Sequence, residues 1–244
     1  MEARLSKWSF INVSEAGRSV MIRNVTNSIS VHHMSSFKIQ DSTISKINSV
    51  QQQFWGNKKN NKGKHFIAWR DVNKSKEEGG LGFRDLEVFN RALLAKFSWK
   101  LCTDDTSIYV RSLRAKYFPN GLVFNTSEHP KFTWSWRSIS SELQFVNKYS
   151  LRSVGDGKKI LIWKYRWIEG LDSPPIPKAS ATHYQDFTFV VQLYDTNKGG
   201  WNISLLSTSF DPATLTLILK ISIHHNLEDR LVWSLERNGC FSVK

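Results

Sequence analysis

Residues 54–101 read FWGNKKNNKGKHFIAWRDVNKSKEEGGLGFRDLEVFNRALLAKFSWKL, and this stretch decides how the chain folds. Its first part closes an apolar segment at Phe54-Trp55-Gly56, and a basic arm rich in asparagine and lysine follows from Asn57 to Lys76. The run Gly79-Gly80-Leu81-Gly82 then predicts a turn. The best helical pattern of the sequence lies directly beyond this turn, so we expect the neighbouring elements to pack around that helix.

The helix is predicted to begin near Asp85, whose carboxylate can accept hydrogen bonds from the first free backbone N–H groups. Apolar residues then recur at steps of three or four, which places them on one helical face. They are Leu86, Phe89, Leu93, Phe97 and Leu101. A neighbouring face is apolar as well, and a helix that is apolar over so wide an arc usually packs between other elements.

The remaining patterns predict an α+β fold in which helices dominate residues 14–148. Two β-hairpins are expected in the C-terminal half, at 149–164 around Gly155-Asp156-Gly157 and at 230–243 around Asn238-Gly239. We therefore divide the chain into four parts. They are a helical region at 1–148, a hairpin segment at 149–170, a proline-rich linker at 171–181 and a small mixed segment at 182–244.

Charge is the strongest indication of a partner. The chain has a net charge of +13 over 244 residues, and nucleic acid is the commonest acidic partner of such a protein. The excess is uneven, since residues 171–244 hold six bases and seven acids, whereas residues 54–76 hold seven bases and one acid. The seven candidate phosphate-binding residues are Lys58, Lys59, Lys62, Lys64, Arg70, Lys74 and Lys76.

Aromatic residues are interleaved with these bases, at His65, Phe66 and Trp69. Together they could grip single-stranded nucleic acid, with phosphates on the cations and bases on the rings. The alternative is a solvated loop beside a short buried helix that Trp69 anchors. From the residues alone we favour this second interpretation, because short basic runs are common and weakly specific.

Catalytic and metal-binding patterns are not found in the sequence. Asp104-Asp105 lies between two predicted helices, where Asp105 or Thr106 is better interpreted as a helix N-cap than as a metal ligand. The turn Gly155-Asp156-Gly157 lacks the Gly-Lys-Ser/Thr ending of a phosphate loop. The histidines and the two cysteines show no ligand spacing. We therefore predict no catalytic residue, no metal site and no cofactor.

The N-terminal sequence lacks the apolar run of a signal peptide, and no apolar run approaches the length of a membrane span. We expect an intracellular protein, nuclear or cytoplasmic, that is not secreted and has no membrane partner.

The block Gly79-Gly80-Leu81-Gly82-Phe83-Arg84-Asp85-Leu86, followed by Phe89-Asn90 and Ala92-Leu93-Leu94-Ala95-Lys96, resembles plant LINE-type (non-LTR) retrotransposon reverse transcriptases. Further matches are LRAKYFP, which ends at Pro119, and WRSI, which begins at Trp136. The resemblance covers nearly the whole chain and corresponds to the region between the polymerase palm and the zinc-binding tail. The chain departs from the family pattern at Phe54, where a second tryptophan is usual, and at Tyr165, where an aspartate is usual.

This resemblance implies a fragment without catalysis, since the palm aspartates, the endonuclease and any ribonuclease H domain lie outside the matched region. In the intact family protein such a thumb-like or connecting region holds template and primer. The implied partners are RNA or DNA, bound without sequence preference, and the missing palm. The alternative from another class is a retained protein-interaction or scaffold module with no nucleic-acid role.

Overall fold

The computed structural model describes residues 13–56, 67–118, 132–195, 197 and 199–243. The described residues fall into two compact units. The first takes those within 1–98, 127–142 and 243–244, and the second takes those within 99–126 and 143–242. The fold class is α+β, as predicted, because most elements are helices and the few strands are short and antiparallel.

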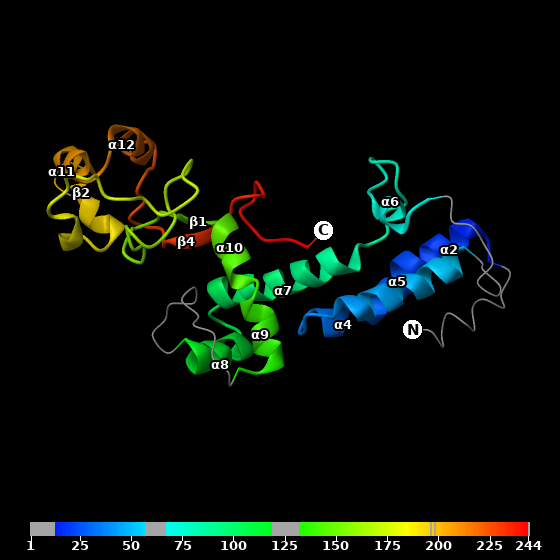
Figure 1. Ribbon diagram of the computed structural model, residues 1–244. Coiled ribbons are helices and arrows are strands. Elements are labelled where there is room, and N and C mark those ends of the chain that lie inside the picture. Colours follow the sequence, from blue (N-terminus) through cyan, green and yellow to red (C-terminus); the bar gives the residue numbers. More distant parts are fainter. Residues whose placement is uncertain (1–12, 57–66, 119–131, 196, 198, 244) are drawn as a thin grey trace. The chain divides into compact units, whose positions relative to one another are not determined.

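Helices build the first unit (Figure 1). In chain order they are α2 (Glu15–Met21), the π-helical turn η1 (Ile22–Thr26), α3 (Asn27–Ile29), α4 (Val31–Met34), α5 (Asp41–Trp55), α6 (Trp69–Asn73), the greater part of α7 (Leu86–Thr103) and α9 (Trp134–Ser140). Ser14 caps α2, since its hydroxyl accepts a 3.2 Å hydrogen bond from the Gly17 N–H. The helical region predicted from residue 14 onward thus begins with α2, which a π-helical turn follows directly.

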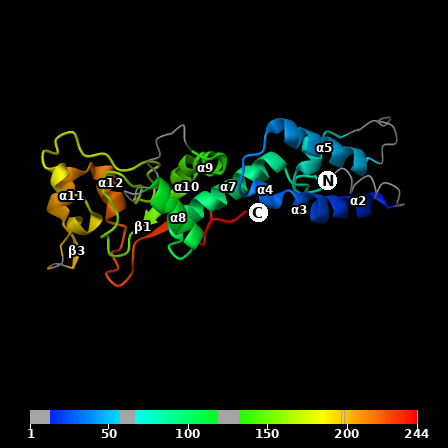
Figure 2. The ribbon, with the colours of Figure 1, turned by 90° about the horizontal axis from the view of Figure 1, so that it is seen from below.

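The run α2–α4 and helix α5 form an antiparallel pair, which lies side by side in both ribbon views (Figures 1 and 2). Polar side chains fasten it internally. Buried Gln51 donates from its amide nitrogen to the Thr26 hydroxyl at 3.0 Å and to the Asn27 side-chain oxygen at 3.1 Å. At the other end, Arg18 donates to the Trp55 carbonyl at 2.9 Å. These hydrogen bonds give the buried Gln51 amide nitrogen its partners within the pair.

Helix α7 begins where the sequence predicts, and Asp85 caps it by accepting from the backbone N–H groups of Glu87 and Val88 at 3.0 and 3.2 Å. Its buried face is rotated from the predicted one. The side chains most deeply buried along α7 are Leu86, Asn90, Leu94, Ala95, Ser98 and Leu101. Phe89, Leu93 and Phe97 are only partly buried. The prediction used apolar residues alone to find the inward face. It therefore missed Asn90 and Ser98, which are polar and yet buried.

The second unit mixes helices and short strands. It holds α8 (Ile108–Tyr117), α10 (Leu143–Tyr149), β1 (Ser150–Ser153), the 3₁₀ turns η2 (Tyr184–Asp186) and η3 (Val190–Leu193), β2 (Tyr194–Asp195), β3 (Gly200–Trp201), α11 (Ile203–Ser209), α12 (Pro212–Ile218) and β4 (Arg230–Trp233). Asp211 caps α12 through the N–H groups of Ala213 and Thr214. The core centres on Trp167, Phe210 and the isoleucines around residue 160.

The two predicted hairpins are wrong in their pairing. Strand β1 pairs antiparallel with β4, so that Ser150 faces Trp233 and Ser153 faces Arg230. The segment after the glycine turn instead bonds to residues 188–190, with the Val190 N–H 3.0 Å from the Ile160 carbonyl. The sequence predicted the turn at residues 155–157 correctly. It could not predict the pairing, because the partners of these segments lie far along the chain.

The structure also places the end of the predicted helical region and the proline-rich segment. The helical region ends in two helices, α9 and α10. The proline-rich segment 171–181 lies against the core of the second unit, since Pro175 is buried and the Lys178 N–H donates to the Ser209 carbonyl at 2.9 Å. The four-part division of the chain itself stays a prediction. Within the described part of the chain, no helix is both long enough and apolar enough to cross a membrane.

Candidate nucleic-acid interface

Only part of the predicted basic arm can be placed. Lys58, Lys59, Lys62 and Lys64 lie outside the described residues, and so do the aromatic residues His65 and Phe66. Arg70 and Lys76 are exposed. Lys74 forms a 2.8 Å ion pair with Asp71, and its hydrogen bond and charge lower the pKa of the Asp71 carboxyl. The described part of the arm therefore presents cations on the surface, one of them already paired.

Trp69 serves the core. Its ring lies 5.3 Å from that of Phe83 and 6.4 Å from that of Trp55, measured between centroids, within a cluster that also contains Val72. Ring pairs at such separations are favourable beyond the area they bury. The structure thus supports the anchoring interpretation of Trp69.

Backbone hydrogen bonds join the glycine turn to α6 and to the residue that follows this helix. The Leu81 N–H donates to the Val72 carbonyl and the Gly82 N–H to the Lys74 carbonyl, both at 2.9 Å. A Cβ atom at Gly80 would meet the Lys74 carbonyl oxygen at 2.1 Å, so only glycine fits there. The glycine run of the sequence is therefore explained by this close return of the chain.

Two acidic sites that resemble ligand-binding patterns have structural roles. Asp104 precedes α8 and accepts from the Thr106 hydroxyl at 2.8 Å and from the N–H groups of Thr106 and Ser107, which lowers the pKa of its carboxyl. Asp105 pairs with Arg114. Asp104 therefore orders the turn ahead of α8. The N-cap residue of this helix is Ser107, which makes no side-chain capping bond, so the prediction of Asp105 or Thr106 in this role is wrong.

The second such site is the turn at Gly155-Asp156-Gly157. The Asp229 carboxylate accepts three backbone N–H groups there, from Gly155 at 2.8 Å, Gly157 at 2.9 Å and Lys159 at 2.8 Å. A ring of converging N–H groups is a typical anion site. Here the anion is the chain's own carboxylate, so the turn is closed to a phosphate. Among the described residues, no group of three or more histidine, cysteine, aspartate or glutamate side chains could hold a metal ion.

The structure reveals one hollow that the sequence did not indicate. It has a volume of about 410 Å³ and belongs to the first unit. It lies between the segment leading into α5 and helix α9, and its lining residues are Lys38, Ile39, Gln40, Asp41, Trp134, Arg137, Ser138 and Ser141. Trp134 and Arg137 are three residues apart on one helix, so their proximity could have been inferred from the sequence. The approach of Lys38 could not, because it comes from a distant part of the sequence.

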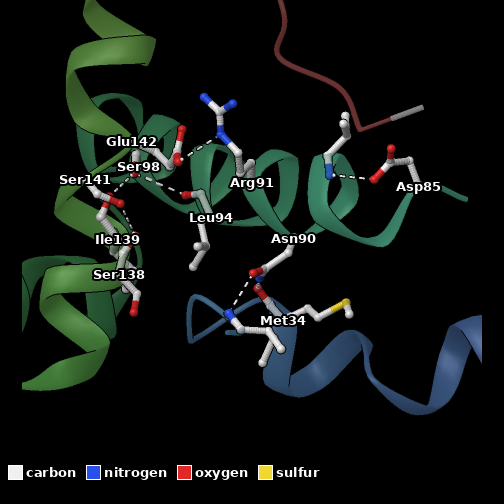
Figure 3. Close-up of polar contacts among 12 residues, drawn as sticks. Met34, Asp85, Asn90, Arg91, Leu94, Ser98, Ser138, Ile139, Ser141 and Glu142 are labelled. Carbon is white, nitrogen blue, oxygen red and sulfur yellow. Dashed lines mark hydrogen bonds and ion pairs between the residues drawn. The ribbon is translucent and has the colours of Figure 1, made fainter. Parts of the chain in front are cut away.

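Asn90 fixes one wall of this hollow. Its side-chain oxygen accepts from the Ile39 N–H at 2.8 Å, and its nitrogen donates to the carbonyls of Met34 and Phe37 at 2.6 and 2.9 Å (Figure 3). Because Asn90 is buried and makes all these bonds, the segment 34–39 is held against α7.

The facing wall is held by the same helix. The Ser98 hydroxyl of α7 donates to the Ile139 carbonyl at 2.7 Å, and Arg91 of α7 lies 3.4 Å from the largely buried Glu142 carboxylate (Figure 3). Helix α7 therefore positions both sides of the hollow.

Comparison with known proteins gives two relatives and no matching family model. The chain is 28% identical over 250 residues to the Arabidopsis thaliana protein named "Putative ribonuclease H protein At1g65750". That match covers 100% of this chain and 40% of the relative, so the chain spans well under half of that protein's length.

The second relative is the "Uncharacterized mitochondrial protein AtMg00310" of Arabidopsis thaliana, which is 38% identical over 149 residues. This match covers 60% of the present chain and 96% of the relative. Because nearly all of this relative is matched at that identity, the chain belongs to the same protein family as AtMg00310.

Proposed function

We propose that this chain is a non-catalytic, sequence-tolerant nucleic-acid-binding part of a LINE-type reverse transcriptase protein. In the intact protein it would hold template and primer beside the polymerase palm. The observation that carries the proposal is the basic arm of residues 57–76, joined to a helical scaffold by the glycine turn.

The comparisons are consistent with this proposal. The longer relative is named as a ribonuclease H protein, and ribonuclease H acts on nucleic acid, so a nucleic-acid role fits a chain that aligns with 40% of it. The motifs around Gly79–Leu86 add the specific resemblance to the reverse transcriptase family. The net charge of +13 supplies the electrostatic attraction that sequence-independent binding requires.

The test is the salt dependence of binding to a fluorescent single-stranded oligonucleotide, measured by anisotropy. On single strands the slope of log K against log salt is about −0.7 per contacted phosphate. Since the seven bases of the arm cannot all face one backbone, we expect about three to five contacts and a slope of roughly −2 to −3.5.

The decisive variant replaces Lys58, Lys59, Lys62 and Lys64 by glutamine. Its matched control neutralises four exposed lysines elsewhere, namely Lys46, Lys96, Lys164 and Lys220. The arm variant should bind more weakly and with a flatter slope than the control. Equal losses would reduce the interaction to diffuse charge, and no binding at low salt would favour the protein-interaction alternative.

The non-catalytic part of the proposal needs its own assay. The purified chain is incubated with Mg²⁺ and either a primed RNA template with nucleotides or an RNA–DNA hybrid. We expect neither primer extension nor cleavage of the hybrid. Metal-dependent turnover that tracks with the chain through purification would overturn this part and leave the binding result untouched.

A further inference from the structure

The hollow beside α9 combines an exposed aromatic ring with two cations. The Trp134 side chain is 61% exposed, although tryptophan is normally among the most buried side chains. Its inner face stacks on Phe37, with 4.9 Å between ring centroids and 26° between ring planes. The ring is therefore held in one orientation by its neighbour while much of it remains open to solvent.

Charge at the hollow favours an anion. Lys38 and Arg137 are exposed and line it from opposite walls, and Gln40, Ser138 and Ser141 add polar groups. The Asp41 carboxylate also lines the hollow and opposes an anion. It stands in the first turn of α5, where the positive end of the helix dipole offsets part of its charge. The two cations outnumber this single acid.

The hollow is also preformed. Asn90 fixes the backbone of residues 34–39, and the Ser135 hydroxyl donates to the Ser36 carbonyl at 3.2 Å, so both walls are tied together. A volume of about 410 Å³ falls within the range of about 300–1,000 Å³ that small-ligand sites occupy. A preformed site loses less conformational entropy when it binds.

From these observations we propose that the hollow binds one nucleotide of a single-stranded nucleic acid, with its base stacked on Trp134 and a flanking phosphate near Lys38 and Arg137. The proposal rests on the proposed function and assigns it a second contact site, separate from the basic arm. A base of any identity offers a ring face, so the contact adds affinity without sequence preference.

The test measures the affinity of labelled ten-residue oligouridine and oligothymidine strands for the full chain. Trp134→Leu should weaken binding about tenfold, because stacking on one aromatic ring contributes on that order. Trp134→Phe, which keeps a ring, should restore most of it. Tyr109→Leu serves as the matched control, since Tyr109 is also a half-exposed aromatic residue but belongs to the other unit.

A second variant tests the charges without disturbing the ring stack. Replacing Lys38 and Arg137 together by glutamine should flatten the salt slope by about 0.7 to 1.4, which corresponds to one or two phosphates. The pair Lys96 and Lys164, changed in the same way, is the control. Circular dichroism confirms that each variant is folded.

Photocrosslinking tests whether the base contacts Trp134 directly. An oligonucleotide carrying one 5-iodouracil should crosslink to the peptide that contains Trp134. Normal binding by Trp134→Leu, or an equal loss in Tyr109→Leu, would overturn the assignment of this site while leaving binding through the arm intact. If the wild-type chain binds neither strand, the proposed function itself fails.

Discussion

We expect Asp229→Asn to destabilise the second unit strongly. Among changes of an acidic residue of this unit to its amide, it should have the largest effect. The Asp229 carboxylate joins three backbone N–H groups of residues 155–159 to the start of β4. It thereby holds together parts of the chain more than 70 positions apart.

The magnitude follows from these hydrogen bonds. Hydrogen bonds to a charged acceptor contribute about 1.5–3 kcal/mol each, and neutral ones about 0.5–1.5 kcal/mol. Asparagine can keep its oxygen toward Gly155 and Gly157, but its amide nitrogen would then face the Lys159 N–H, donor against donor. One charged bond is lost and two become neutral. Water can reach the Lys159 N–H, which reduces the penalty, so we expect a loss of about 2–4 kcal/mol.

Urea unfolding, followed by tryptophan fluorescence, measures this loss. Trp163, Trp167 and Trp201 belong to the second unit's core and its edge, so their signal reports on its unfolding. Because the chain has two compact units, the curve should be fitted for two transitions before a free energy is assigned. The expected effect falls on the transition of the second unit.

Glu228→Gln is the matched control, since Glu228 is the adjacent acid and its partner is the exposed Lys159 ammonium. An exposed ion pair contributes little to stability, so this variant should unfold like the wild type. The reasoning is refuted if Asp229→Asn unfolds within about 0.5 kcal/mol of the wild type, the scatter typical of neutral surface changes. It is equally refuted if Glu228→Gln costs as much.

Four more predictions concern helix α7 and the cysteines. Leu94→Ala should cost about 2–5 kcal/mol in the free energy of unfolding, and Leu93→Ala clearly less, because only Leu94 is fully buried; equal costs would restore the originally predicted face. Asn90→Ala should cost about 2–4 kcal/mol, since it leaves buried groups of the 34–39 segment unpaired, and hydrogen exchange of the Ile39 amide should rise; an unchanged exchange rate would contradict this role. Burial raises the pKa of the Cys102 thiol to about 12, against the opposing charges of Arg152 and Arg114. At pH 8 a thiol reagent should therefore label the exposed Cys240 and spare Cys102. Stability should fall above pH 9.0, because the unfolded thiol ionises there and the folded one does not.

Local chemistry made several helix starts predictable. Ser14, Asp85 and Asp211 each cap a helix through N–H groups at most three residues ahead, so the whole interaction is contained in a short stretch of sequence. The glycine turn before α7 was predictable for the same reason, since its bonds join residues within a ten-residue span. Helix α5 differs from these, because it begins at Asp41 without a side-chain cap from the preceding Gln40.

Long-range pairing was not predictable from these patterns. Strand β1 finds its partner 80 residues away, and the turn that was expected to fold it back is instead held by Asp229. The inward face of α7 was misplaced because Asn90 and Ser98 are polar residues whose partners are carbonyl groups more than 40 residues distant. A buried polar residue is informative only when its partner is known, and periodicity cannot supply that partner.

The difference between local and long-range contacts also affects where a nucleic-acid base could stack. Trp69 lies within the basic arm in the sequence, where it could stack on a base or anchor a short buried helix. The favoured anchoring interpretation is supported, because its ring packs against Trp55 and Phe83. Trp134 attracted no such attention, because Phe37 and Lys38 are almost a hundred residues away from it. Surface lysines are common, so a basic run alone discriminates weakly between functions, whereas an open tryptophan that a neighbour holds in place is unusual. The stacking contact therefore depends on Trp134, whereas the basic arm carries the proposal of sequence-tolerant binding.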